Sequence, residues 1–186
     1  MTNEVTALVV EDDLDMRDEI EDGLAVLGHG HHWAQSQQEA YELIQRTHYD
    51  YVLVDLEIPA RTGRGFAKIE YGKKLISQIQ RAKGRGRVPV VVMTAHHMHG
   101  LNLARELLIH GAMEFLSKPF GDVGNGKSLP ETVQNVLDAH RKLFPRGALP
   151  GDPPEQFRGG TLAFYPDHIE LAGEAILEED GPGHAW

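Results

Sequence analysis

The chain has 186 residues, with 18 Lys and Arg against 28 Asp and Glu, a formal net charge of −10 and no cysteine. A chain of this length forms one ordinary domain with room for a small appendage. The lack of cysteine excludes disulfides, thiol nucleophiles and cysteine-ligated zinc, so folding needs no oxidising compartment. No apolar run approaches the length of a membrane span, and residues 1–10 do not resemble a signal peptide. We therefore expect a cytoplasmic protein without membrane contact.

The charge is unevenly distributed along the chain. Residues 1–60 carry 14 acids and 2 bases, residues 61–87 carry 9 bases and 1 acid, and residues 145–186 carry 8 acids and 2 bases. Nucleic-acid binding depends largely on basic side chains that neutralise phosphates, so this balance argues against such binding by the chain alone. The basic stretch predicts a solvated face, or a docking surface for an acidic partner or for the acidic end of the same chain.

Five short apolar runs predict β-strands. They are Thr6–Val10, His32–Gln35, Tyr51–Asp55, Val88–Thr94 and Met113–Ser117. Most are apolar throughout, which is typical of parallel strands that are covered on both faces. Helical periodicity in the intervening segments predicts helices over residues 16–27, 36–44, 71–79, 101–110 and 130–137. The regular alternation of strand and helix predicts an α/β fold with a doubly wound parallel sheet and helices on both faces.

The composition changes after Phe144. Residues 145–160 contain four Pro and five Gly or Ala, so we expect a linker there and a domain over residues 1–144. In residues 161–186, Thr161–Tyr165, His168–Leu171 and Glu174–Leu177 predict a short β hairpin or a three-stranded meander. So short a tail cannot bury a core of its own. It either docks on the first domain, pairs with another chain, or begins a further domain.

Polar residues follow four of the five predicted strands, at the sheet edge where ligands bind in open parallel sheets. Glu11 and Asp12 follow the first strand, and Asp55, Thr94 and Lys118 lie at the ends of the third, fourth and fifth. Three neighbouring carboxylates repel one another unless a cation binds, and an all-oxygen ligand set favours Mg²⁺. A lysine and a hydroxyl opposite them suit the oxygens of a phosphoryl group.

This set of residues permits attack by a carboxylate on phosphorus to give an aspartyl phosphate. Asp55 is the predicted nucleophile, because it lies at the centre of the sheet between the acidic cluster and Lys118. The acids after the first strand are clustered as metal ligands would be. For Asp13 alone, the sequence favours a helix cap.

The motifs ALVVEDD, YVLVDLEIP, VVVMTAH and GAMEFLSKPF occur in this order, each at a predicted strand end. Together they resemble the receiver domain of two-component response regulators, over residues 5–144. The resemblance implies a flavodoxin-like sheet of five strands in the order 2-1-3-4-5. It also implies phosphorylation on Asp55, with Mg²⁺ held by Glu11, Asp12 and Asp55 and by the backbone carbonyl of Glu57.

The resemblance assigns further roles. Thr94 resembles the hydroxyl that moves to the phosphoryl oxygens, Lys118 the lysine that pairs with them, and Phe115 the aromatic switch residue. Glu57 and His96 occupy positions that tune phosphoryl lifetime in known members of the family. The implied phosphodonor is a sensor histidine kinase or a phosphotransfer protein. Phosphorylation is then expected to remodel the face made by the fourth helix, the fifth strand and the fifth helix, which controls an output or a partner and can form a homodimer.

Three features depart from the family pattern. The interval between Asp55 and Thr94 is several residues longer than usual, and the loop after Phe120 is lengthened by GDVGNGKS. Phe115 has no hydroxyl, so a switch that ends in a hydrogen bond from that residue is excluded. None of these departures removes a residue of the expected phosphorylation site.

Two groups of histidines invite a metal-site interpretation. One comprises His29, His31 and His32, and the other comprises His96, His97 and His99. They fall at opposite edges of the predicted sheet and so cannot form one site within a monomer. We expect exposed loop histidines in both groups.

The leading hypothesis is a signalling receiver that catalyses only its own phosphorylation and dephosphorylation, not a metabolic enzyme. One alternative is an interaction-only pseudo-receiver. Another is a truncated DNA-binding transcriptional regulator, because FRGGTLAFYPDHIELAGEAIL resembles the opening strands of a winged-helix effector domain. A remote alternative is an aspartyl-phosphate phosphohydrolase, which would carry Asp-x-Asp on its first strand, whereas this chain has Asp55-Leu56-Glu57 on the third.

Overall fold

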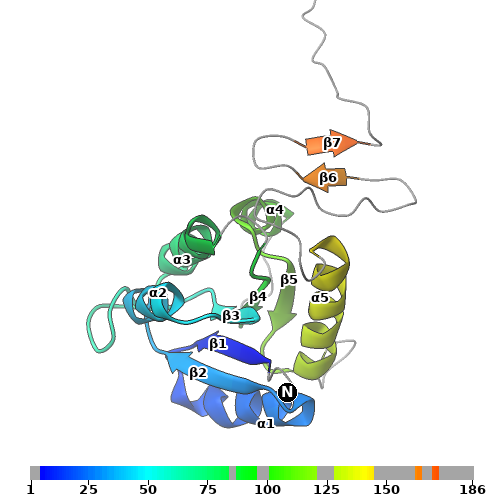
Figure 1. Ribbon diagram of the computed structural model, residues 1–186. Helices are drawn as coiled ribbons and strands as arrows, with labels where there is room; N and C mark the ends of the chain where they lie inside the picture. The colour runs from blue at the N-terminus through cyan, green and yellow to red at the C-terminus, as the bar shows by residue number, and fades with distance from the viewer. Residues whose placement is uncertain are drawn as a thin grey trace, which may run out of the picture. The chain divides into compact units, whose positions relative to one another are not determined.

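The computed structural model describes residues 5–83, 87–95, 101–120 and 128–144, and the backbone of two short strands near the carboxyl terminus. A parallel sheet has the strand order β2-β1-β3-β4-β5 (Figure 1). Its strands are β1 (Thr6–Val10), β2 (Gly30–Ala34), β3 (Tyr51–Asp55), β4 (Val90–Thr94) and β5 (Glu114–Ser117). The predicted fold class and strand order are confirmed.

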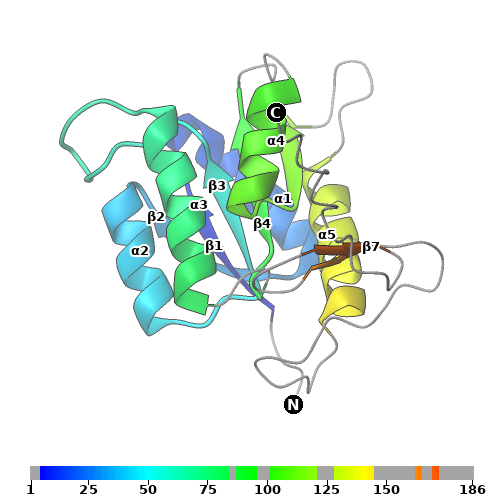
Figure 2. The same cartoon turned by 90° about the horizontal axis from the view of Figure 1, so that it is seen from above.

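Helices cover both faces of the sheet. They are the 3-10 helix η1 (Leu14–Met16), α1 (Arg17–Leu27), α2 (Gln37–Arg46), α3 (Ile69–Lys83), α4 (Leu101–His110) and α5 (Leu129–Leu143). One face carries α2, α3 and α4 side by side, and the other carries α1 and α5 (Figures 1 and 2). Gly28 ends α1 in the left-handed region with φ of 66°, which glycine adopts at little cost. At the start of α2, Ser36 Oγ accepts a hydrogen bond from the Glu39 amide.

Each central strand contributes side chains to two separate cores. Val52 and Val54 pack with α2, α3 and α4, whereas Tyr51 and Leu53 pack with α1 and α5. All five residues of β3 are buried, as are all five of β4. Continuous apolar sequence therefore marks these strands correctly, because both of their faces are covered.

Strand boundaries differ from the prediction at three places. The second strand is Gly30–Ala34 rather than His32–Gln35, because the Gln35 amide donates to Glu39 Oε2 and belongs to the start of α2. The fourth strand begins at Val90 rather than Val88, since Pro89 has no N–H to donate. The fifth begins one residue late, at Glu114.

The prediction of exposed loop histidines is wrong for the first group. His31 and His32 lie within β2, and His29 and His31 are half-buried. His29 Nδ1 lies 3.0 Å from the hydroxyl of Tyr51, and His32 Nδ1 lies 2.9 Å from that of Tyr49. These contacts join residues that are distant in sequence, so local pattern does not reveal them. The second group, His96, His97 and His99, lies outside the described residues.

The chain divides into two compact units, Met1–His140 and Arg141–Trp186. In the second unit, β6 (Leu162–Phe164) pairs with β7 (Ile169–Leu171) in an antiparallel hairpin. The expected linker over residues 145–160 and the third strand at Glu174–Leu177 lie outside the described residues. Within the part of the chain that the structure describes, no helix has the length and apolarity needed to cross a membrane.

Candidate functional site

An open cavity of about 490 Å³ lies at the carboxyl ends of the central strands. Its lining comprises Glu11, Asp12, Asp13, Met16, Asp55, Glu57, Ala67, Ala95, Lys118 and Pro119. The structure thus brings together five of the residues that the sequence places at this site. They come from three strand ends far apart in the chain, as expected for a parallel sheet whose strands all end at one edge.

Lys118 is the only described cation that lines this cavity. Its Nζ donates to Glu11 Oε2 over 2.5 Å and lies 3.1 Å from Asp55 Oδ2. The three side chains are largely buried, with exposed fractions of 7% for Lys118, 0% for Glu11 and 11% for Asp55. Hydrogen bonds between charged groups are strong in such a setting, so the lysine holds both carboxylates in place.

The backbone fixes the Asp55 carboxylate at the end of the central strand. The Glu57 amide donates to Asp55 Oδ1 over 3.3 Å, and the Leu56 amide donates to the carbonyl of Met93 in β4. On the neighbouring strand, the Glu11 amide donates to the Ala34 carbonyl, and Glu11 Oε1 accepts from the Asp13 amide. Asp13 in turn caps η1 by accepting from the Asp15 amide. The helix-cap interpretation of Asp13 is therefore confirmed.

Electrostatics in the cavity favour the binding of a cation. Burial raises the pKa of Glu11 to about 7, and the negative charge of Asp55 adds to this effect while Lys118 opposes it. Burial also raises the pKa of Asp12. For Lys118, burial favours the neutral amine, but the charges of Asp55 and Glu11 outweigh it and raise its pKa. Three carboxylates thus share one ammonium, and a further positive charge would stabilise their ionised forms.

The donor set suits Mg²⁺. Glu11, Asp12 and Asp55 each offer a carboxylate oxygen, and these oxygens lie within 4.8 Å of one another. Hard oxygen donors arranged around an open, water-accessible space are what Mg²⁺ requires, since it keeps several waters when bound. The residues present therefore fit the ion that the sequence predicts.

Thr94 and Phe115 are not among the residues that line the cavity. Thr94 ends β4, is 4% exposed, and its carbonyl accepts from the Lys118 amide over 2.9 Å. Phe115 is half-buried on β5 and packs against the core shared with α3 and α4, where Leu103 and Leu107 also lie. His96, the other position expected to tune the phosphoryl group, lies outside the described residues.

Met16 and Ala67 are among the lining residues that the sequence-based site does not include. Met16 appears in the sequence as part of the apolar stripe of a helix, and its neighbour Arg17 begins α1. Ala67 belongs to the extra segment between β3 and α3, which folds back to the cavity. No signal in the sequence marks an alanine for this role, because its position depends on tertiary contacts of the whole segment.

Comparison with known proteins decides the family. The model of the response regulator receiver domain matches residues 7–124. The chain belongs to the response regulator receiver family. Receivers serve phosphorylation-dependent signalling in two-component systems, and they bind Mg²⁺ at an acidic pocket of the kind formed here by Glu11, Asp12 and Asp55.

Two curated relatives illustrate the range of proteins that contain such a receiver. The chain is 33% identical to the transcriptional regulatory protein QseB of Escherichia coli O157:H7, over 92% of this chain and 71% of QseB. It is 29% identical to a protein-glutamate methylesterase/protein-glutamine glutaminase of Treponema pallidum (strain Nichols), over 64% of this chain. The chain spans only 28% of the length of that enzyme.

Solved structures show the same fold. A CheY-like receiver domain protein from Methanospirillum hungatei JF-1 aligns with a TM-score of 0.59 and 19% identity, over 75% of this chain and 98% of that chain. The receiver domain of a sensor histidine kinase from Pseudomonas aeruginosa PAO1 aligns with a TM-score of 0.55 and 24% identity, over 73% and 96% of the two chains. That second structure has a magnesium ion coordinated in its active-site cleft.

Proposed function

We propose that this receiver accepts a phosphoryl group on Asp55 from a phosphohistidine of a sensor histidine kinase or phosphotransfer protein. The supporting observation is the position of the Asp55 carboxylate, which lines an open cavity with Lys118 Nζ at 3.1 Å and two further acids beside it. We place this activity in the cytoplasm. The chain acts as a switch that catalyses its own phosphorylation and dephosphorylation, and not as a metabolic enzyme.

In the proposed transfer, a carboxylate oxygen of Asp55 attacks phosphorus. A P–O bond forms, the P–N bond to the donor imidazole breaks, and the imidazole leaves with the electron pair and takes a proton. Lys118 already contacts Asp55, so its ammonium lies where it can pair with oxygens of the arriving phosphoryl group. The Glu57 amide keeps the carboxylate oriented throughout.

The proposed magnesium site uses Glu11, Asp12 and Asp55, together with the backbone carbonyl of Glu57. When bound, Mg²⁺ would neutralise charge on the phosphoryl oxygens and on the carboxylates that otherwise repel them. The magnesium ion in the related histidine-kinase receiver supports this proposal. Lys118, which contacts both Asp55 and Glu11, supplies a further positive charge.

We further propose that phosphorylation acts on the output through Thr94 and Phe115. The Thr94 hydroxyl would move to the phosphoryl oxygens, and Phe115 would change its packing against the core beneath α4. The face made by α4, β5 and α5 would then bind a partner or a second copy of the chain. Glu57 is the proposed tuning residue, since its carboxylate could orient a water for dephosphorylation. His96 is a second tuning candidate.

The test is intact mass after incubation with Mg²⁺ and acetyl phosphate. We expect a gain of one phosphoryl group in the wild type, and none in Asp55→Asn or after the metal is chelated. Asp13→Asn is a matched control, because Asp13 lines the same cavity and asparagine caps a helix as well as aspartate. No gain in the wild type would refute the proposal and favour an interaction-only pseudo-receiver.

A second candidate function is transcriptional regulation by a longer protein of which this chain is a part. The match to the transcriptional regulator QseB extends over 92% of this chain, and β6 and β7 form an antiparallel hairpin in the segment after α5. These observations favour the opening strands of an effector domain over an unrelated tail. The test is DNA binding by the product of the full reading frame, with and without phosphorylation.

A further inference from the structure

The segment between β3 and α3, residues 59–68, forms an ordered arm beside the cavity. The backbone carbonyls of Pro59 and Ala60 accept hydrogen bonds from the Gln37 and Gln38 amides at the start of α2, at 3.0 and 3.1 Å. These amides have no partner within their own helix, so the arm satisfies them. The arm is thereby tied to α2 along the first part of its length.

Further contacts tie the middle of the arm to α2 and join parts of the arm to each other. The hydroxyl of Thr62 lies 3.1 Å from Ser36 Oγ and 3.1 Å from Glu39 Oε2, both at the start of α2. The Arg64 amide donates to the Arg61 carbonyl, and the Lys68 amide donates to the Ile58 carbonyl. A segment held at both ends and at its tip loses little conformational entropy when it binds another molecule.

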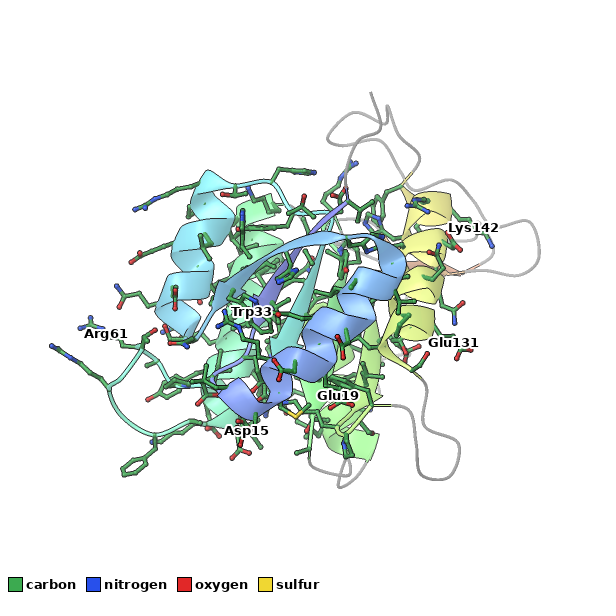
Figure 3. All side chains as sticks on the ribbon, turned by 90° about the horizontal axis from the view of Figure 1, so that it is seen from below. Asp15, Glu19, Trp33, Arg61, Glu131 and Lys142 are labelled. Atoms are coloured by element: carbon green, nitrogen blue, oxygen red, sulfur yellow. The ribbon has the colours of Figure 1, made fainter. Side chains whose placement is uncertain are left out.

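The arm is basic at an otherwise acidic edge of the domain. Arg61, Arg64 and Lys68 are exposed, and no acid occurs in residues 58–69. Within the described part of the chain, these three side chains form no ion pair. By contrast, besides the buried Glu11 and Asp55, four acids lie at the cavity or at the adjoining helix start: Asp12, Asp13, Asp15 and Glu57. Figure 3 shows Arg61 on a loop that projects away from the helices, with Asp15 at the start of the helical segment.

The arm also exposes a large aromatic side chain. Phe66 is 86% exposed, more than any other large apolar side chain that the structure describes. It directly precedes Ala67, which lines the cavity. Leu14, 61% exposed, directly follows Asp13, which also lines it. Exposed aromatic and arginine side chains on rigid supports are the usual anchors of protein interfaces.

We propose that residues 59–68 are a docking arm for the protein that delivers the phosphoryl group to Asp55. That protein must bring a phosphohistidine into the cavity, which Ala67 of the arm lines, so its surface comes close to the arm that carries Phe66 and the three bases. It would offer an apolar recess for Phe66, bordered by carboxylates that face Arg61 and Arg64. This inference rests on the proposed phosphorylation of Asp55, and it assigns the recognition of the donor to residues outside the reacting groups.

Phosphorylation by acetyl phosphate reports on the chemistry at Asp55 without the docking of a protein donor. It is small enough to reach Asp55 without contacting the exposed side chains of the arm. Changes in the arm should therefore leave phosphorylation by acetyl phosphate unchanged while they weaken transfer from a protein donor. A docking contact that is equally strong before and during transfer raises KM and leaves kcat unchanged.

The experiment uses the full chain. The donors are the autophosphorylated histidine kinases of the source organism, and its phosphotransfer proteins after a kinase has phosphorylated them. Each donor is tested against the wild type, Phe66→Ser, and a triple variant with Arg61→Gln, Arg64→Gln and Lys68→Gln. For the fastest donor we expect KM to rise about tenfold in either variant with kcat within about twofold. The wild-type rate should also fall with added salt, and the triple variant should lose most of that dependence.

Matched controls carry the same changes elsewhere on the surface. Val26→Ser removes an exposed apolar side chain from α1, and Lys74→Gln with Arg81→Gln removes exposed charges from α3. These variants should keep the wild-type KM.

Three outcomes would overturn the docking arm: an unchanged KM in both arm variants, an equal rise in the controls, or no transfer from any donor while acetyl phosphate still labels Asp55. If acetyl phosphate does not label the wild type, the proposed function itself fails, and the inference fails with it.

Discussion

Lys118 Nζ donates to Glu11 Oε2 over 2.5 Å and so joins the end of β5 to the end of β1, two positions 107 residues apart. The same ammonium lies 3.1 Å from Asp55 Oδ2 at the end of β3, one of the two strands between them. One cation therefore compensates two carboxylates that are almost completely buried. Removal of one of these three groups would leave a buried charge without a partner. An unpaired buried charge strongly destabilises the folded state.

We predict that Lys118→Met slows phosphorylation by acetyl phosphate by about 100-fold or more, because the positive charge that would meet the phosphoryl oxygens is lost. Affinity for Mg²⁺ should stay the same or increase, since the change removes a cation next to the carboxylates Glu11 and Asp55. The rate is measured from the gain in intact mass, and the affinity by titration calorimetry. A rate within about threefold of the wild type would contradict the role of Lys118.

We predict that Mg²⁺ stabilises the folded domain through the carboxylates of Glu11, Asp12 and Asp55. At free Mg²⁺ about ten times Kd, binding to the native state alone adds about 1.4 kcal/mol to the free energy of unfolding. Asp12→Asn should lose most of this increase, because one of the three clustered oxygens loses its charge. Urea unfolding with and without Mg²⁺ measures the difference, and Asp13→Asn should retain the full increase.

We predict that Gly72→Ala destabilises the protein by roughly 1–3 kcal/mol, even though alanine favours helices. A Cβ at position 72 would lie 2.3 Å from the backbone oxygen of Leu56, the residue directly after Asp55, so α3 would have to move. Gly23→Ala is the comparison, because its Cβ would meet only the flexible end of Leu129 at 3.0 Å. Urea unfolding should show a change within about 1 kcal/mol for Gly23→Ala. Equal changes in both variants would exclude the close approach as the cause.

Much of the fold follows from local sequence. The buried strands are apolar throughout, and Gly28 and Ser36 mark helix boundaries by their own chemistry. The predicted bounds of the edge strand β2 lie too far along the chain. A half-exposed edge strand tolerates His31 and His32, whereas a central strand requires aliphatic residues, so β2 lacks a clear apolar run. An apolar run therefore identifies a strand only where both of its faces are covered.

The sequence could predict that Glu11, Asp12, Asp55 and Lys118 lie together, because parallel strands end at the same edge of the sheet. The arm over residues 59–68 could not be assigned in this way. Its shape depends on contacts such as Thr62 with Ser36, which are 26 residues apart and lie on different elements. The exposure of Phe66 depends on that shape, and so the docking surface appears only in the folded chain.

The contact between α3 and α4 predicts a dependence of stability on pH. Lys73 Nζ donates to Glu106 Oε2 over 2.8 Å, and this hydrogen bond lowers the pKa of Glu106 below its usual value of 4.5. The charge of Lys73 contributes further, and His110, whose Nε2 lies 3.8 Å from Glu106, also lowers that pKa. A carboxyl with a lower pKa in the folded state stabilises the protein above its unfolded pKa, and this stabilisation is lost as the pH falls through the folded pKa.

We therefore expect Glu106→Gln to lower the free energy of unfolding at pH 7, and this effect to disappear as the pH falls through the folded pKa of Glu106, below which the carboxyl is protonated in both states. The Glu106 side chain is 45% exposed, so solvent screening limits the difference to about 0.5–1 kcal/mol. Glu70→Gln removes an exposed acid at the start of α3 and serves as the control. Urea unfolding across this pH range measures both variants. A difference that persists at low pH would show that Glu106 acts by packing and not by its charge.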